Sequence, residues 1–255
     1  MSNIPEPIQR HRDLTQRSAA ALRRPLNRLV RQTMKPYYQD DYVTIYHGDC
    51  REIVPTLGRF DLLLTDPPYG MQFVSNYRAV RYDAIIGDDA LPVDDIVKFV
   101  SFANRAAYVF CRWDNIGQLP KPRSVLAWVK NNWSMGNLKH EHGRQWEACC
   151  FYPQAGHEFI KRIPDVIVCS RTGNNLHPTE KPVGLMTTII AANVCDTILD
   201  PFAGSGTTGR AAKDLNRKAV LIEREEQYCE IAARRMRQEV LPLEMHNKSR
   251  TASQR

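Results

Sequence analysis

Residues 197–208 read TILDPFAGSGTT: a short apolar strand, a turn of small residues and the start of a helix. Gly204 and Gly206 would let the backbone of this turn approach a ligand closely. The N–H groups at the start of the helix would face an anion. The turn is not a P-loop, because the G-x-x-x-x-G-K pattern is missing. This stretch predicts an open α/β sheet that binds a ligand at the tip of one strand.

Short apolar runs alternate with helix-like stretches over most of the chain. Runs rich in Val, Ile and Leu and flanked by helices are typical of a largely parallel sheet covered on both faces. The expected strands are Val43–Tyr46, Phe60–Thr65, Ala107–Cys111, Val125–Val129, Ala148–Tyr152, Val166–Cys169, Thr197–Leu199 and Ala219–Ile222. The expected helices are Val93–Asn104, Pro182–Asn193, Thr207–Leu215 and Glu225–Glu239. The pattern predicts an α/β fold with a mostly parallel central sheet.

A second strand and turn lie at residues 61–70, which read DLLLTDPPYG. The prolines fix the backbone and remove two N–H donors, so this turn presents carbonyl oxygens. The Asp66 carboxylate and the Pro67 carbonyl could together accept both N–H bonds of an amino group on an aromatic base. Tyr69 could stack on that base once the base has left the duplex. The alternative is a Pro-rich turn that Asp66 merely caps.

An acidic residue follows the strand expected at Ala219–Ile222. Glu223 lies 23 residues after Asp200, and an acid at the second strand tip, about 20 residues on, can hold ribose hydroxyls. The alternative is an ordinary acid at the N-terminus of the helix expected at Glu225–Glu239. The sequence alone leaves both interpretations open.

The 255 residues have a net charge of +7, and this charge is unevenly distributed. Residues 1–35 hold eight Arg and Lys against Glu6 and Asp13 and are expected to form a basic arm, and residues 244–255 a polar tail. A basic arm suits a phosphate backbone, and a solvated arm without contacts is the alternative. No apolar run is long enough for a membrane span or a signal core, so we expect a cytoplasmic protein without a membrane partner.

The two motifs together resemble the amino-group DNA methyltransferases, which methylate N6 of adenine or N4 of cytosine. In that family D-P-P-Y is the catalytic motif and D-P-F-x-G-S-G-T-T is the cofactor loop. The stretches IYHGDC (residues 45–50) and HPTEKP (residues 177–182) resemble two further motifs of the family. The resemblance covers about residues 36–240. It implies a Rossmann-like methyltransferase fold that binds S-adenosylmethionine.

The resemblance also implies a role for each matching residue. Asp49 inherits a contact with the adenine of the cofactor, and residues 177–182 help to wall the cofactor pocket. Transfer would be direct, and no metal is expected. The catalytic residues are Asp66, Pro67, Pro68 and Tyr69. The cofactor-binding residues are Asp49, Asp200, Pro201, Phe202, Gly204, Ser205, Gly206, Thr207, Glu223, His177, Thr179 and Lys181.

The order of the motifs narrows the resemblance. D-P-P-Y precedes the glycine turn by about 135 residues, whereas ordinary Rossmann-type methyltransferases have the reverse order. This circularly permuted order resembles the beta group of the family. It argues against the release-factor glutamine and guanine-N2 RNA methyltransferases, which use Asn-Pro-Pro-Tyr after the glycine turn. Cytosine-C5 chemistry is excluded, because it needs a Cys after Pro and no Pro-Cys dipeptide occurs.

The type of base is less firmly indicated than the family. Asp rather than Ser at position 66 favours N6 of adenine. The alternatives are an N4-cytosine methyltransferase and a non-catalytic DNA-binding relative. The beta group often forms dimers, so the resemblance also implies a homodimer, encoded by a bacterium or a phage and belonging to the restriction–modification enzymes or their orphan relatives.

Two segments of the expected methyltransferase domain, residues 36–243, could contact double-stranded DNA. Residues 70–91 would form a loop over the target base, and residues 131–176 occupy the place of the family's target-recognition region. For any single basic residue, phosphate contact or simple solvation is commoner than base readout. The candidate DNA-binding residues are Tyr77, Arg78, Arg81, Lys139, Arg144, Lys161 and Arg162.

Overall fold

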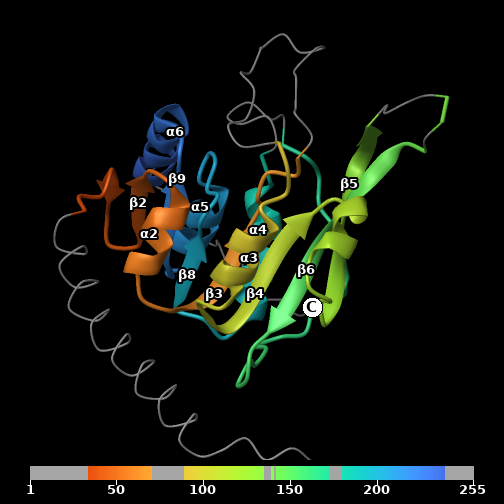
Figure 1. Ribbon diagram of the computed structural model, residues 1–255, viewed down its shortest axis with the longest axis horizontal. Coiled ribbons are helices and arrows are strands. Elements are labelled where there is room, and N and C mark those ends of the chain that lie inside the picture. Colours follow the sequence, from red (N-terminus) through yellow and green to blue (C-terminus); the bar gives the residue numbers. More distant parts are fainter. Residues whose placement is uncertain (1–33, 71–88, 135–138, 141, 173–179, 239–255) are drawn as a thin grey trace, which may run out of the picture.

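The computed structural model describes residues 34–70, 89–134, 139–140, 142–172 and 180–238. Its nine strands form one sheet in the order β1-β2-β9-β8-β3-β4-β6-β5-β7 (Figure 1). The strands are β1 (Tyr38–Gln39), β2 (Val43–His47), β3 (Phe60–Thr65), β4 (Ala103–Cys111), β5 (Ser124–Ser134), β6 (Arg144–Pro153), β7 (Val166–Val168), β8 (Thr197–Asp200) and β9 (Lys218–Glu223). The helices are α2 (Cys50–Ile53), α3 (Val93–Val100), α4 (Val183–Ala192), α5 (Thr207–Asp214) and α6 (Glu226–Arg237), with short 3₁₀ turns η1 (Val54–Thr56) and η2 (Trp113–Gln118).

The sheet is mostly parallel, as the sequence predicts. Strands β2, β9, β8, β3 and β4 are neighbours that run in the same direction. Their carboxyl ends therefore lie along one edge of the sheet, where open α/β sheets bind ligands. The antiparallel pairs are β1 with β2 and β6 with both β4 and β5, while β7 runs parallel to β5.

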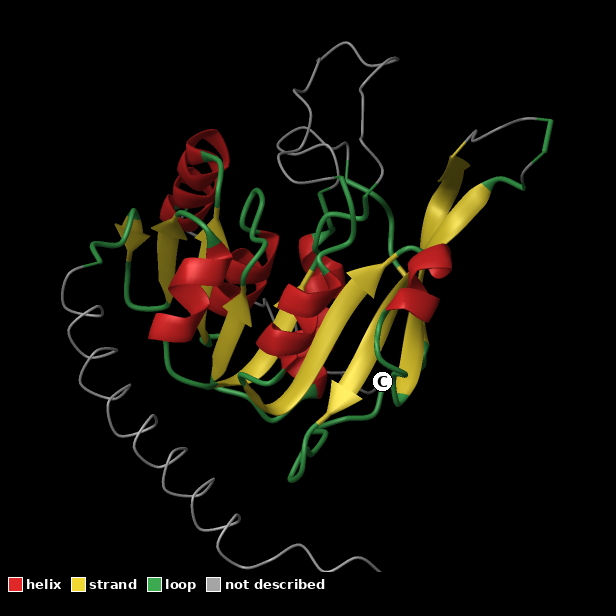
Figure 2. Cartoon of the chain, in the orientation of Figure 1, coloured by secondary structure: helices red, strands yellow, loops and turns green. Residues whose placement is uncertain are grey.

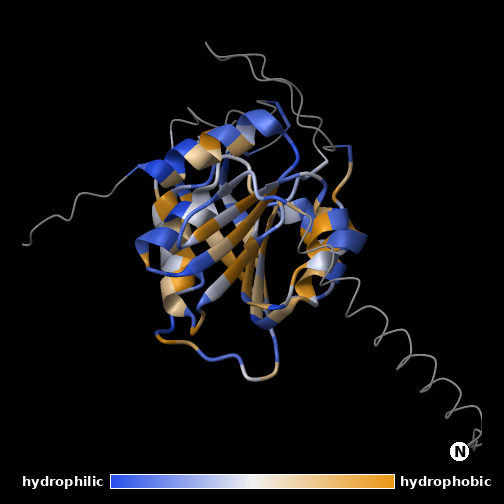
Figure 3. Ribbon diagram, turned by 90° about the vertical axis from the view of Figure 1, so that its left-hand side faces the viewer, coloured by the Kyte–Doolittle hydropathy of each residue, from blue (hydrophilic) through white to orange (hydrophobic). Residues whose placement is uncertain are grey.

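Helices cover both faces of the sheet (Figure 2). Side chains alternate across a strand, so Leu62 and Leu64 of β3 pack on the face covered by α4, α5 and α6, whereas Leu63 packs on the face with α2 and α3. The central strands are accordingly apolar and the outer faces of the helices polar (Figure 3). None of the helices in the described ranges is long and apolar enough to cross a membrane.

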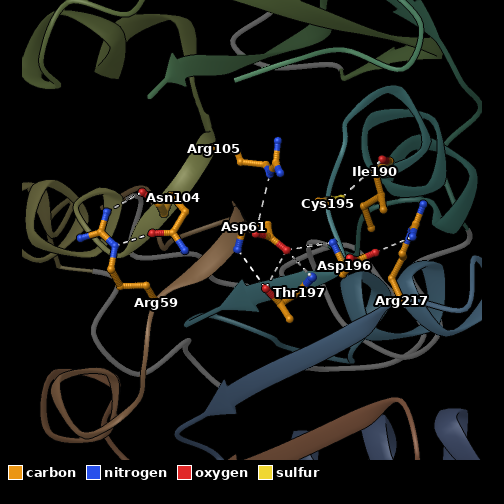
Figure 4. A network of polar contacts seen from close by, with 10 residues as sticks. Arg59, Asp61, Asn104, Arg105, Ile190, Cys195, Asp196, Thr197 and Arg217 are labelled. Carbon is orange, nitrogen blue, oxygen red and sulfur yellow. Dashed lines mark hydrogen bonds and ion pairs between the residues drawn. The ribbon is translucent and has the colours of Figure 1, made fainter. Parts of the chain in front are cut away.

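A polar network fixes the amino ends of β3 and β8 to each other (Figure 4). The Asp61 carboxylate accepts from the backbone N–H of Asp196 (2.9 Å) and of Thr197 (3.1 Å) and from the Thr197 hydroxyl (3.0 Å). The Asp61 N–H donates back to that hydroxyl at 2.9 Å. These bonds hold the two strands in one register, so the tips at their other ends are fixed relative to each other.

The expected helix at Val93–Asn104 is partly wrong. Helix α3 ends at Val100, and β4 already begins at Ala103. The N–H groups of Ser101 and Phe102 close the last turn on the carbonyls of Lys98 and Phe99. The following residues pair with β3 instead, which buries Ala103 and Ala106. Pairing with a neighbouring strand outweighs the helical propensity of this alanine-containing stretch.

The other expected strands and helices are present, with ends that differ by a few residues. Within residues 131–176, β6 and β7 are strands of the main sheet, so the described strands of this segment belong to the same sheet as the rest of the domain. Most of the basic arm (residues 1–33), most of the loop after the catalytic motif (71–88) and the polar tail lie outside the described residues.

Candidate active site

The tips of β3 and β8 are joined directly. Leu63 pairs with Leu199 in the register of the two strands, and the Thr65 hydroxyl donates to Asp200 Oδ1 at 2.7 Å. D-P-P-Y starts one residue after Thr65, and the glycine turn starts one residue after Asp200. Two motifs that are far apart in the sequence therefore leave the sheet from adjacent strands.

Asp200 lies beneath the glycine turn and holds its shape. Its carboxylate accepts from the hydroxyls of Thr65 and Thr208 (2.6 Å) and from the N–H of Phe202 (3.1 Å), and the residue is only 3% exposed. Burial raises the pKa of Asp200 to about 6, against the opposing effect of these donors. The structure thus places this predicted cofactor residue inside the protein, under the turn.

Asp200→Asn should reduce the pH dependence of stability. Because the folded-state pKa is raised to about 6, the contribution of Asp200 to wild-type stability is largest at low pH and is lost as pH rises through about 6. Asn is neutral throughout and has nearly the same shape. We expect the free energy of unfolding of the variant, relative to wild type, to improve by about 1–2 kcal/mol between about pH 5 and pH 7.5. Urea unfolding at both pH values measures this, and a constant difference would contradict the assigned burial.

The glycine turn is linked to the next strand tip through Glu223, the last residue of β9. Glu223 accepts from the N–H of Gly204 (2.8 Å) and from that of Glu225 (2.8 Å). Burial raises the pKa of Glu223, although both N–H groups oppose this. Gly206 has a φ of +78°, and a Cβ there would lie 2.8 Å from the Cβ of Ala232. Only glycine fits at this position.

Asp49 follows β2 at the same edge of the sheet. The Gly48 N–H donates to the Glu223 carbonyl at 2.9 Å, which brings the two tips together. Asp49 caps the short helix α2 and pairs with the Arg51 side chain. That arginine lowers the pKa of Asp49, so this carboxylate remains ionised. Four acidic residues, Asp49, Glu223, Asp200 and Asp66, thus follow or end four adjacent strands.

The D-P-P-Y turn forms a compact polar cluster. The Tyr69 hydroxyl donates to Asp66 Oδ1 at 2.5 Å, and the Lys181 ammonium pairs with Asp66 Oδ2. Burial and the facing carboxylate raise the pKa of Tyr69 well above its usual value, so its hydroxyl remains a donor. The side-chain amide of Asn115, in η2, donates to the Tyr69 carbonyl at 3.0 Å and holds the turn from the other side.

Glu147 is a second carboxylate in this cluster that sequence reasoning missed. It lies on β6, 3.1 Å from the Lys181 ammonium, and it pairs with Lys130 of β5. Burial alone would raise the pKa of Glu147, but the two ammonium groups lower it to about 2. No motif surrounds Glu147, so only the pairing of β4, β5 and β6 could have identified it.

Arg235 of α6 is also part of the site, and sequence reasoning missed it too. Its buried guanidinium donates to the hydroxyls of Thr207 (2.8 Å) and Ser205 (3.3 Å) and pairs with Glu180. Glu180 immediately precedes Lys181. Arg235 therefore links the glycine turn to the segment that carries Lys181.

The predicted DNA-binding residues that are described fall into two groups. Lys139 and Arg144 belong to the β5–β6 hairpin, which extends past the carboxyl end of β4 (Figure 1). Lys161 and Arg162 follow β6 near the end of α4, where the Lys161 N–H donates to the Ala192 carbonyl. This is the opposite edge of the sheet, so the structure does not bring the second pair to the D-P-P-Y turn. Outside the described residues lie Tyr77, Arg78, Arg81, His177 and Thr179.

The polar groups along these strand tips fit S-adenosylmethionine. The Asp49 and Glu223 carboxylates can accept from hydroxyl and amino groups, and the N-terminus of α5 can face the carboxylate of the methionine moiety. Phe202 is partly exposed beside this turn, 6.1 Å from Phe99 between ring centroids. A mostly parallel sheet with a glycine turn and D-P-P-Y on adjacent strand tips defines the class: a Rossmann-like α/β methyltransferase.

Comparison with known proteins supports this class and narrows it. The DNA methylase family of N6 and N4 methyltransferases matches residues 128–234. The chain is 42% identical over 252 residues to the type II methyltransferase M2.MboI of Moraxella bovis, covering 79% of this chain and 91% of that protein. It is 26% identical over 263 residues to the type II methyltransferase M.HinfI of Haemophilus influenzae, covering 80% and 71%. The chain therefore belongs to the N6-adenine and N4-cytosine DNA methyltransferase family.

Solved structures agree on the fold. The crystal structure of the M1.HpyAVI–SAM complex superimposes with a TM-score of 0.60 at 25% identity, over 76% of this chain and 99% of that chain. The cytosine-N4-specific PvuII DNA methyltransferase has a TM-score of 0.62 at 17% identity, over 82% and 91%. At 17% identity, the similarity to the PvuII enzyme shows the fold alone.

Proposed function

We propose that the chain transfers a methyl group from S-adenosylmethionine to N6 of adenine in double-stranded DNA, as a DNA methyltransferase. The observation that carries this proposal is the position of the Asp66 carboxylate at the strand tip beside the glycine turn, held by Tyr69 and Lys181. The match to the DNA methylase family supports activity on DNA, and the relatives M2.MboI and M.HinfI are named as type II methyltransferases. Their bacterial sources support a cytoplasmic enzyme of the restriction–modification type.

The chemistry needs acceptors for an amino group. S-adenosylmethionine supplies an electrophilic methyl group on a sulfonium centre. The amino nitrogen of adenine is a weak nucleophile, because its lone pair is delocalised into the ring. The ionised Asp66 and the Pro67 carbonyl would accept its two N–H bonds, which directs the lone pair out of the ring plane. As the N–C bond forms, the methyl C–S bond breaks with its electron pair going to sulfur, S-adenosylhomocysteine leaves, and the methylated nitrogen releases one proton to solvent. Pro68 provides no competing N–H, and the Tyr69 ring stacks on the flipped base.

The cofactor would be held by the row of strand tips. Glu223 would accept from the ribose hydroxyls, Asp49 would contact the adenine, and Gly204 and Gly206 would admit the methionine end beside α5. Pro201, Phe202, Ser205 and Thr207 give the turn its shape, His177 and Thr179 wall the pocket, and Asp200 acts from beneath the turn.

The identity of the methylated base is proposed from the residue at position 66. Asp at position 66, in place of the Ser of N4-cytosine enzymes, favours adenine. The fold does not discriminate between the two, since the cytosine-N4-specific PvuII enzyme has it as well. The motif order supports the beta group, and with it a homodimer.

Digestion of methylated DNA to nucleosides distinguishes these substrates. DNA treated with the purified chain and S-adenosylmethionine should yield N6-methyladenine as its only new nucleoside, measured by chromatography and mass spectrometry. N4-methylcytosine would show that the alternative base is correct. No methylated nucleoside from an enzyme that binds DNA would support a non-catalytic relative.

DNA contact is proposed for the β5–β6 hairpin. Lys139 and Arg144 lie on it together with Trp133 and Trp146, which are 66% and 43% exposed. Basic and aromatic side chains together suit a phosphate backbone and unstacked bases. Tyr77, Arg78 and Arg81 of the preceding loop remain candidates on sequence grounds. Because Lys161 and Arg162 lie at the opposite edge, we do not include them in this surface.

A further inference from the structure

The Lys181 ammonium is shared between two buried carboxylates from different parts of the chain. It pairs with Asp66 Oδ2 of the D-P-P-Y turn and lies 3.1 Å from Glu147 Oε2 of β6, and its third donor reaches the Tyr69 hydroxyl at 3.3 Å. The side chain is 4% exposed. An ammonium has three N–H donors, so these contacts use all of them. Its position is therefore fixed on the target side of the site.

The rings around Lys181 support a permanently charged ammonium. Its nitrogen lies 5.4 Å from the ring centroids of Tyr69 and Phe110 and 5.9 Å from that of Trp128. Burial alone would lower the pKa of Lys181, but Asp66 and Glu147 raise it above its usual value. Two carboxylates and two ammonium groups, counting Lys130, balance each other in the cluster.

Glu147 also pairs with a second cation, Lys130, so the two carboxylates that share Lys181 are not equivalent. If the Lys181 charge were lost, Asp66 and Glu147 would face each other as like charges in a buried site, where one carboxylate must take up a proton. Lys130 would still hold Glu147 ionised. The proton would therefore go to Asp66, the group that must accept from the target amine.

We propose that Lys181 is a positioning residue for the target amine, held by Glu147 and Lys130, and that it keeps the Asp66 carboxylate ionised and oriented. This role differs from the cofactor contact that the family motif implies for Lys181. It rests on the proposed function, in which Asp66 binds the amino group as an acceptor.

Several other groups face Asp66 and influence its charge. They come from the turn itself, from β4, β6 and β8 and from the segment before α4: Tyr69, Cys111, Cys149, Glu147, Asp200 and Lys181. Burial raises the pKa of Asp66, and Lys181 is the strongest influence in the opposite direction. Lys181 is therefore the side chain whose removal should matter most for protonation.

The test is the pH profile of single-turnover methyl transfer at saturating S-adenosylmethionine and DNA. On the acidic side of this profile the rate should rise with pH as Asp66 loses its proton; we call this the acid limb. In Lys181→Met the acid limb should shift to higher pH by about one unit or more. The double variant Lys181→Met/Glu147→Gln should move it back towards wild type, because the like charge is gone. Glu147→Gln alone should not raise it, and Lys181→Arg should leave it close to wild type.

Two further measurements exclude a merely structural effect. The affinity of Lys181→Met for S-adenosylmethionine, measured by calorimetry, should stay within about twofold of wild type, and its thermal unfolding should remain cooperative. Lys121→Met, at an exposed lysine before the amino end of β5, is the charge-matched control. An unmoved acid limb in Lys181→Met, no recovery in the double variant, or a large loss of cofactor affinity would overturn the proposal. Asp66→Ala, assayed alongside, tests the proposed function separately: if it is inactive and the limb is unmoved, only this inference fails.

Discussion

Asp66→Ala should lower the rate of methyl transfer to DNA by at least about 100-fold, because it removes the carboxylate that accepts from the target amine. The loss should appear in kcat, since the contact matters most as the new bond forms. Affinity for S-adenosylmethionine should change little, because Asp66 belongs to the turn after β3 whereas the glycine turn follows β8. Transfer of labelled methyl groups and calorimetry measure the two effects.

The matched control is Asp41→Ala, at an exposed aspartate outside the row of strand tips. It should have wild-type kinetics. Asp66→Asn is a stricter variant: it keeps the shape of the side chain but has one acceptor oxygen and no charge, so it should also be severely impaired. Near-normal turnover in either Asp66 variant would show that the carboxylate does not hold the amine.

Glu223→Ala should weaken binding of S-adenosylmethionine by about 10- to 100-fold, which corresponds to about 1.4–2.8 kcal/mol. Two effects add. The ribose would lose a carboxylate acceptor, and the N–H groups of Gly204 and Glu225 lose the carboxylate that now fixes them. The glycine turn therefore loses both a ligand contact and its link to β9. Isothermal calorimetry of the purified chain measures the affinity.

Glu158→Ala, at an exposed glutamate on the opposite edge of the sheet, is the control for this change. Glu223→Gln separates the two effects, because its amide oxygen can still accept from one backbone N–H. We expect it to bind the cofactor with intermediate affinity. Unchanged affinity in Glu223→Ala would remove Glu223 from the cofactor site.

The sequence predicts the fold and the row of strand tips well. D-P-P-Y and the glycine turn each follow an apolar strand, and parallel strands bring such ends to one edge of a sheet. The local signals, Pro-Pro after Asp66 and glycines around Ser205, lie within a few residues of the positions they define. The helix expected at Val93–Asn104 ends earlier than predicted, at Val100, because pairing with β3 decides where β4 begins.

Partners that come from distant strands could not be predicted. Glu147 and Arg235 have no motif around them, and their roles depend on which strands and helices meet in three dimensions. The burial of Asp200 is a second case. Its motif indicates a site residue, but only the hydroxyls of Thr65 and Thr208 show that it acts from beneath the turn. Lys181 is a third case: its motif indicates a cofactor residue, but only the structure shows that its ammonium pairs with Asp66 and Glu147.

The central claim is that the chain methylates N6 of adenine in DNA through Asp66. The most direct test is sequencing, with detection of modified bases, of DNA from cells that express either the wild-type chain or Asp66→Ala. The account predicts methylation at N6 of adenine in one sequence context with the wild-type chain and none with the variant. Methylated adenine in both samples, or no modified base with a well-expressed wild-type chain, would contradict it.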